Sequence, residues 1–84
     1  MAHVTNGIRR ILNDHARLSV DAASIDGSAD LFDAGMSSHA SVNVMIALED
    51  AFDIEFPDSM LRRATFASVD AIGGAVARLQ AESS

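Results

Sequence analysis

Residues 30–39 read Asp30-Leu31-Phe32-Asp33-Ala34-Gly35-Met36-Ser37-Ser38-His39, and at this stretch a glycine-containing loop gives way to a helix. The apolar spacing that follows predicts an α-helix that begins at Ser38 and ends near Phe52. A serine at the start of a helix is most often an N-cap, which stabilises the helix by about 1 kcal/mol. Its hydroxyl is also exposed and held in place, so Ser38 is a candidate site for chemical modification.

The rest of the chain contains further helical patterns. Apolar residues at helical spacing predict one helix over about residues 3–17 and another over about residues 66–80, the latter capped by Thr65 or Ser68. A proline followed by a capping aspartate predicts a brief helix over residues 59–63. We therefore expect an all-α fold, a four-helix bundle of three longer helices and one short helix.

The helix that begins at Ser38 carries apolar side chains around more than half of its circumference. A helix that packs against one neighbour needs an apolar stripe only about 100° wide, so this helix is predicted to lie at the centre of the bundle. Its apolar residues are Val42, Val44, Met45, Ile46, Leu48 and Phe52.

The segment 18–37 shows no sustained helical pattern and is long for a loop in a small domain. Loops of more than about 12–15 residues are usually functional or disordered. Leu31 and Phe32 within this loop are apolar and are predicted to pack into the core, which favours an ordered loop.

Length and cysteine content limit the class of protein. A chain of 84 residues is predicted to form one domain, spanning residues 1–84, with a small core. The chain contains no cysteine, which excludes disulfides and thiolate metal sites. Asp53, Glu55 and Asp58 follow the central helix, but they lack the ordered run of oxygen ligands that an EF-hand requires, so no metal site is expected.

The charge distribution predicts which partners suit the chain. The formal net charge is −6, and residues 21–58 hold nine acids and no Lys or Arg. Such an acidic segment repels nucleic acid and attracts basic protein surfaces. No apolar run approaches the roughly 20 residues that cross a bilayer, and the N-terminal residues lack the apolar stretch of a signal peptide. We therefore expect a cytoplasmic protein, monomeric on its own, without nucleic-acid or membrane partners.

The sequence offers little for catalysis. The three histidines stand in no HExxH spacing, and no GxSxG element is present. His39 follows Ser38 directly, but adjacent residues on a helix diverge by about 100°, so their side chains do not face each other as a base and a nucleophile would. We therefore expect a protein that is not an enzyme.

Two further motifs follow Ser38 at fixed spacing. The central helix contains Met45-Ile46-Ala47-Leu48-Glu49-Asp50-Ala51-Phe52, and the turn after it reads Ile54-Glu55-Phe56-Pro57-Asp58. Together with residues 30–38 they resemble the acyl carrier protein family, over about residues 30–72. In that family the pattern runs Asp-Leu-Phe, a spacer, Gly, two residues, the modified Ser, a helix that ends in Ala-Leu-Glu-acid-x-Phe, and an Ile-Pro-Asp-like turn.

The resemblance implies a prosthetic group on Ser38. A phosphopantetheinyl transferase would attach 4′-phosphopantetheine from coenzyme A to the serine hydroxyl through a phosphodiester, and the terminal thiol would carry a carboxylic acid as a thioester. A phosphate there would meet the exposed N–H groups and the positive dipole end of the helix. Ser37 is the neighbouring alternative, but the Gly-x-x-Ser spacing from Gly35 selects Ser38.

The chain departs from the family beside this serine. Family members usually have Asp-Ser-Leu where this chain has Ser37-Ser38-His39, and carriers for fatty acid synthesis tend to have acids where this chain has Ala40 and Asn43. We therefore expect poor engagement of fatty acid enzymes and a partner face of small and hydrogen-bonding side chains. The predicted face comprises His39, Ala40, Asn43 and Ala47.

Residues 35–42, 52–58 and 66–68 look most like those of a small stand-alone group, the aminoacyl carrier proteins. These are loaded by ligases that resemble the catalytic core of class II seryl-tRNA synthetases. The resemblance therefore implies an amino acid:carrier-protein ligase as partner, and a small amino acid such as glycine or alanine as cargo. Two alternatives stay open: an acyl carrier protein for fatty acid or polyketide synthesis, and an unmodified helical module for protein interactions.

Overall fold

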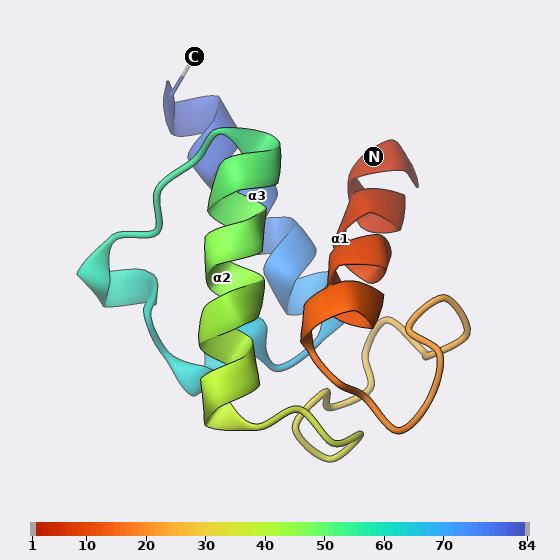
Figure 1. Cartoon of the computed structure of the whole chain (residues 1–84). Helices are drawn as coiled ribbons and strands as arrows, with labels where there is room; N and C mark the ends of the chain where they lie inside the picture. The colour runs from red at the N-terminus through yellow and green to blue at the C-terminus, as the bar shows by residue number, and fades with distance from the viewer. Residues whose placement is uncertain (1, 84) are drawn as a thin grey trace.

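The chain folds into three α-helices and two short 3-10 helices in the computed structural model, which describes residues 2–83 (Figure 1). The elements are α1 (Ala2–His15), α2 (Ser38–Phe52), η1 (Asp58–Met60), η2 (Arg63–Phe66) and α3 (Val69–Ser83). No strand occurs within residues 2–83, and α2 runs antiparallel to α1 (Figure 1). The predicted all-α fold is confirmed.

Local backbone conformations explain where the first two helices end. α1 stops at His15 instead of residue 17, because Arg17 takes a left-handed conformation with a φ of 56° that an α-helix does not continue. α2 spans the predicted residues and ends where Asp53 takes a φ of 53°. The Asp53 N–H donates to the carbonyl of Glu49, which satisfies one of the free acceptors at the helix end.

The region between α2 and α3 differs most from the prediction. The single short helix expected over residues 59–63 is replaced by η1 and η2, and Phe66, expected in the last helix, lies in η2. α3 therefore begins at Val69. The Ser68 hydroxyl accepts a 3.0 Å hydrogen bond from the Ala71 N–H, so the predicted cap is confirmed.

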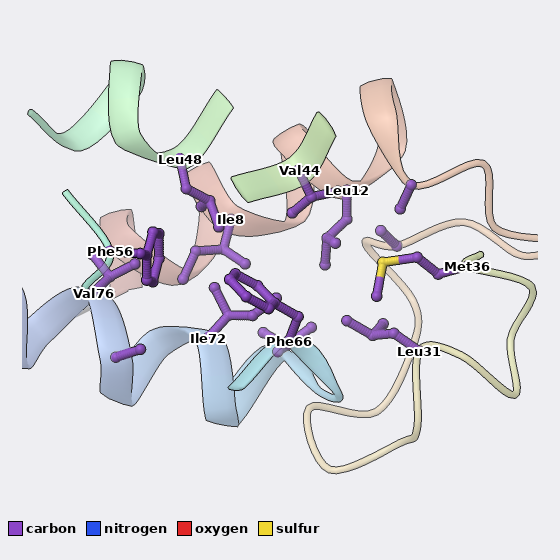
Figure 2. Close-up of a cluster of buried hydrophobic side chains, with 14 of the residues drawn as sticks. Ile8, Leu12, Leu31, Met36, Val44, Leu48, Phe56, Phe66, Ile72 and Val76 are labelled. Carbon is purple, nitrogen blue, oxygen red and sulfur yellow. The ribbon is translucent and has the colours of Figure 1, made fainter. Parts of the chain in front are cut away.

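Side chains from the three α-helices and from the long loop meet in one core, where they point toward one another (Figure 2). The loop contributes Leu31, which is fully buried as predicted, and Met36, which is nearly so, whereas Phe32 is half-buried at the edge of the core. Burial of one large aliphatic side chain stabilises a fold by about 1.5–3 kcal/mol. The fully buried helical members are Ile8, Leu12, Val44, Leu48, Ile72 and Val76.

α2 is less enclosed than predicted. Ala40, Val44 and Leu48 are buried, but Val42 is 48% exposed and Ile46 is 54% exposed. α2 has two helical neighbours, as expected of a central helix, but part of its apolar arc stays exposed. α2 packs against α1 and α3, and the side that carries Val42 and Ile46 stays partly open to solvent.

The loop between α1 and α2 is tied to both neighbouring parts of the fold. Arg9 Nη1 donates to the carbonyl of Ala22 at 2.7 Å and to the carbonyl of Ile25 at 2.6 Å. At the other side of the loop, the Leu31 N–H donates to the carbonyl of Ala67 at 2.7 Å. These bonds satisfy backbone groups that the irregular loop does not pair itself.

We expect Arg9→Met to lower the free energy of unfolding by about 1.5–3 kcal/mol, because two carbonyls lose hydrogen bonds from a charged donor. Urea unfolding followed by circular dichroism measures the change. The matched variant Arg10→Met removes an exposed guanidinium from the same helix and should stay within about 0.5 kcal/mol of the parent. Equal losses in the two variants would show that Arg9 acts through its charge and not through these bonds.

Candidate functional site

α2 begins with two serines whose hydroxyls differ in role. Ser37 is extended, with φ −83° and ψ 165°, and its Oγ accepts a 3.0 Å hydrogen bond from the Ala40 N–H. Ser37 is therefore the N-cap, and the expectation that Ser38 caps the helix is wrong, because Ser38 is already the first helical residue. The exposed Ser38 hydroxyl forms no hydrogen bond to any other of residues 2–83, so it is free to react.

A turn at Gly35 orients the two serines at the start of α2. Gly35 has a φ of +118°, a conformation that residues with a side chain rarely adopt. A Cβ at this position would also lie 3.3 Å from the backbone nitrogen of Ser19. The N–H and the hydroxyl of Ser19 both donate to the carbonyl of Ala34, at 2.9 Å and 2.8 Å. The turn is thus held firmly against the start of the long loop, just before α2 begins.

The predicted partner face lies only partly at the surface. His39 and Asn43 are exposed, and Ala47 is half-buried. Ala40 is only 4% exposed, so its inclusion in the face is wrong: it lies one turn before Val44 on the buried side of α2. The exposed side of α2 carries instead the apolar residues described above, which helical spacing alone assigns to the core.

A groove of about 360 Å³ opens beside Ser38. Besides Ser38 it is lined by Ser41, by Arg62 and Arg63, and by apolar side chains of the loop, of α2 and of the segment before α3. The guanidinium carbon of Arg63 lies 4.0 Å from the centre of the Phe32 ring, a cation–π contact. The apolar lining residues are Phe32, Val42, Met45, Leu61 and Phe66.

Sequence reasoning missed this groove. Arg62 and Arg63 stand well beyond Ser38 in the chain, and no helical or loop pattern connects them to it. The one available signal is that these two adjacent arginines are the first basic side chains after the segment 21–58, in which no Lys or Arg occurs. Only the path of the chain after α2 brings the two arginines to the groove beside the serine.

The arrangement suits covalent attachment of an anionic group at Ser38. The hydroxyl is exposed and has no hydrogen-bond partner among residues 2–83, and the N-terminal end of a helix favours negative charge. The first turn of α2 holds no acid that would repel an anion. Arg62 and Arg63, whose guanidinium groups can bind phosphate oxygens through several N–H donors, line the adjacent groove.

Other chemistry finds less support in the described residues. His39 forms no hydrogen bond with Ser38 within residues 2–83, so the two do not make a nucleophile–base pair there. Asp53, Glu55 and Asp58 do not form a cluster, since no three His, Asp or Glu side chains of the described residues lie together as metal ligands would. Each helix in this part of the chain is too short or too polar to cross a membrane.

Comparison with known proteins links the chain to a protein family and to a similar protein. The family described as "Phosphopantetheine attachment site" matches residues 7–76. An "Aminoacyl carrier protein" of Agrobacterium fabrum (strain C58) is 51% identical over 65 residues, which cover 77% of this chain and 78% of that protein.

Solved structures are similar to the whole fold. One is a chain in the crystal structure of an engineered Bradyrhizobium japonicum glycine:[carrier protein] ligase complexed with carrier protein from Agrobacterium tumefaciens and ATP. It superposes with a TM-score of 0.87 at 46% identity, and the match covers 90% of this chain and 99% of that chain. A solution structure of an Agrobacterium tumefaciens protein superposes with a TM-score of 0.74 at 43% identity, and the match covers 94% and 95%.

We expect Ser37→Ala to lower the free energy of unfolding by about 1 kcal/mol, because the Ala40 N–H loses its cap. Ser38→Ala removes a hydroxyl without a hydrogen bond and should change stability by less than about 0.5 kcal/mol. Thermal or urea unfolding of the two unmodified variants measures the difference. A larger loss in Ser38→Ala than in Ser37→Ala would contradict the assignment of the cap.

Proposed function

Because the chain belongs to the phosphopantetheine attachment-site family, we propose that it carries an amino acid as a thioester on a 4′-phosphopantetheine arm attached to Ser38. The observation that carries the proposal is the exposed hydroxyl of Ser38, which has no hydrogen-bond partner in the described part of the chain and lies at the start of α2, beside a groove lined by two arginines. Ser37 is the weaker candidate for attachment, since its oxygen is already engaged in the helix cap.

The residues around Ser38 fit such a group. Ser38 Oγ would form the phosphodiester, and the free N–H groups and dipole of α2 would stabilise the phosphate charge by about 0.3–1 kcal/mol. The Gly35 turn and the Ser37 cap hold the hydroxyl outward while the helix stays intact. When bound, the group supplies a thiol that carries a carboxylic acid as a thioester. The chain itself has no cysteine that would compete for this cargo.

Two observations support an amino acid as the cargo. The relative named "Aminoacyl carrier protein" shares half of its aligned residues with this chain, and the matching carrier of Agrobacterium tumefaciens was crystallised with a glycine:[carrier protein] ligase. The first acid on α2 is Glu49, so the half of the helix near Ser38 lacks the carboxylates that suit the basic surfaces of fatty acid enzymes. We infer a small amino acid such as glycine or alanine.

The protein then acts as a carrier for enzymes and not as a catalyst. A phosphopantetheinyl transferase would attach the arm, and an ATP-dependent amino acid:carrier-protein ligase would load it. Both reactions draw on coenzyme A or ATP, which are abundant in the cytoplasm, so we place the carrier there. For the ligase contact we propose the exposed part of the predicted face, His39 and Asn43, extended by the exposed apolar residues Val42 and Ile46.

Intact-mass measurement after incubation with coenzyme A and a phosphopantetheinyl transferase tests the attachment site. The parent protein should gain the mass of one arm, and Ser38→Ala should gain none. The matched variant Ser37→Ala should still be modified, because it loses a helix cap but keeps the reacting oxygen. Modification of Ser38→Ala, or no modification of the parent, would rule out Ser38 as the attachment site.

Loading of the modified protein by the ligase, with ATP and glycine or alanine, tests the partner face. We expect Asn43→Asp and Ile46→Asp to lower the loading rate about tenfold, equivalent to about 1.4 kcal/mol, and to leave arm transfer nearly unchanged. Ala77→Asp puts the same charge on an exposed position of α3 and serves as the control. Equal losses in loading and in arm transfer, or equal losses in the control, would contradict this face. Loading with a fatty acyl or malonyl group but with no amino acid would favour the acyl carrier alternative.

A further inference from the structure

The groove beside Ser38 has an unusual charge for this chain. Acids outnumber Lys and Arg by 12 to 6 in the sequence, yet the groove is lined by two arginines and by no acid. The single ion pair among the described residues joins Arg78 to Glu82 on α3, so Arg62 and Arg63 have no carboxylate partner within residues 2–83. The groove is therefore a small basic region in an acidic protein.

The fold brings both arginines to the groove. The Arg63 guanidinium lies 4.0 Å from the centre of the half-buried Phe32 ring, which keeps it over the wall of the groove. Arg62 immediately precedes η2 and is exposed. Phe66, at the end of η2, is only 5% exposed, and its buried ring anchors the segment that carries both arginines. The positive charge at the groove is thus built into the fold.

The walls of the groove are apolar and partly open. Leu61 is 46% exposed and Val42 is 48% exposed, and Met45 is half-buried. An apolar group that covers this surface removes it from water, which stabilises the contact. Ser38 lines the same groove, so a chain attached to its oxygen starts beside it.

We propose that this groove sorts the two states of the arm by charge: it holds the unloaded arm and excludes the arm that carries an amino acid. The inference rests on the proposed function, since it requires the arm on Ser38. The unloaded arm offers an anionic phosphodiester to Arg62 and Arg63, and a branched hydrocarbon segment to Leu61 and Val42. Its end is an uncharged thiol, so nothing in it is repelled by the groove.

Loading with an amino acid changes the charge at the end of the arm. An amino acid joins the thiol through its carboxyl group, so its α-amino group stays free, and such groups have a pKa of about 7.7–8.0. At neutral pH the loaded arm therefore ends in an ammonium ion. In the groove this ion would lose water and meet a net positive charge, because two guanidiniums outweigh the single phosphodiester anion of the arm and no acidic side chain lines the groove. The loaded amino acid is thus kept outside, available to the enzyme that takes it.

The test uses three forms of the protein, each made by attaching a synthetic arm to Ser38 and verified by intact mass. One form carries the plain arm, one ends in a glycyl group through a stable amide, and one ends in a propionyl group. Glycyl and propionyl differ only in an ammonium in place of a methyl group. NMR chemical shifts of Val42, Met45, Leu61 and Phe66, and contacts between these side chains and the methyl groups of the arm, report occupancy of the groove.

We expect the plain and propionyl arms to shift these resonances and to give contacts, and the glycyl arm to occupy the groove about tenfold less at pH 6.5. Above the pKa of its amino group the glycyl arm should return to the groove. Arg62→Gln with Arg63→Gln should reduce occupancy by the plain arm and narrow the difference between glycyl and propionyl.

The outcomes separate a failure of the proposed function from a failure of the inference about the groove. If no arm can be attached to Ser38, the proposed function fails and the groove loses its occupant. If the arm attaches but the groove resonances match those of the unmodified protein, or if glycyl and propionyl arms behave alike, the inference is overturned while the proposed function stands. The double variant changes two exposed side chains, so an unchanged circular dichroism spectrum serves as the check that its fold is intact.

Discussion

The burial of one stripe of α2 sets the rotation of that helix, and the functional site depends on this rotation. Ala40, Val44 and Leu48 pack into the core against α1 and α3, which leaves Val42, Asn43 and Ile46 facing outward. Each large member contributes about 1.5–3 kcal/mol, which is a sizeable part of the stability of a small domain. A rotation that buried Val42 or Asn43 instead would expose this stripe.

The long loop determines where α2 begins. Leu31 and Met36 are buried, and Arg9 of α1 binds two loop carbonyls, so the chain reaches the helix along a defined path. The positive φ of Gly35 turns the chain just before the two serines. Because Ser37 takes the capping role, the N-terminus of α2 is stabilised without the hydroxyl of Ser38. Ser37 therefore stabilises the helix, while the neighbouring Ser38 keeps a hydroxyl that can react.

The segment between α2 and α3 supplies the third side of the site. The rings of Phe56 and Phe66 pack 5.2 Å apart in the core, at 59° to each other, and anchor both ends of this segment. Between these anchors the chain turns outward and carries Arg62 and Arg63 to the groove. Two buried aromatic residues thus place two exposed cations beside a serine distant in sequence.

Local pattern determined the limits of α2, the turn at Gly35, the exposed hydroxyl of Ser38 and the burial of Leu31, because helix spacing, turn residues and caps depend on neighbours in the chain. Only the tertiary structure decided that Ala40 is buried while apolar residues on the other side of α2 are exposed. It also decided that two arginines line the groove beside the serine. The rotation of a helix and the neighbours it acquires depend on side chains far away in the sequence, whose packing no local spacing encodes.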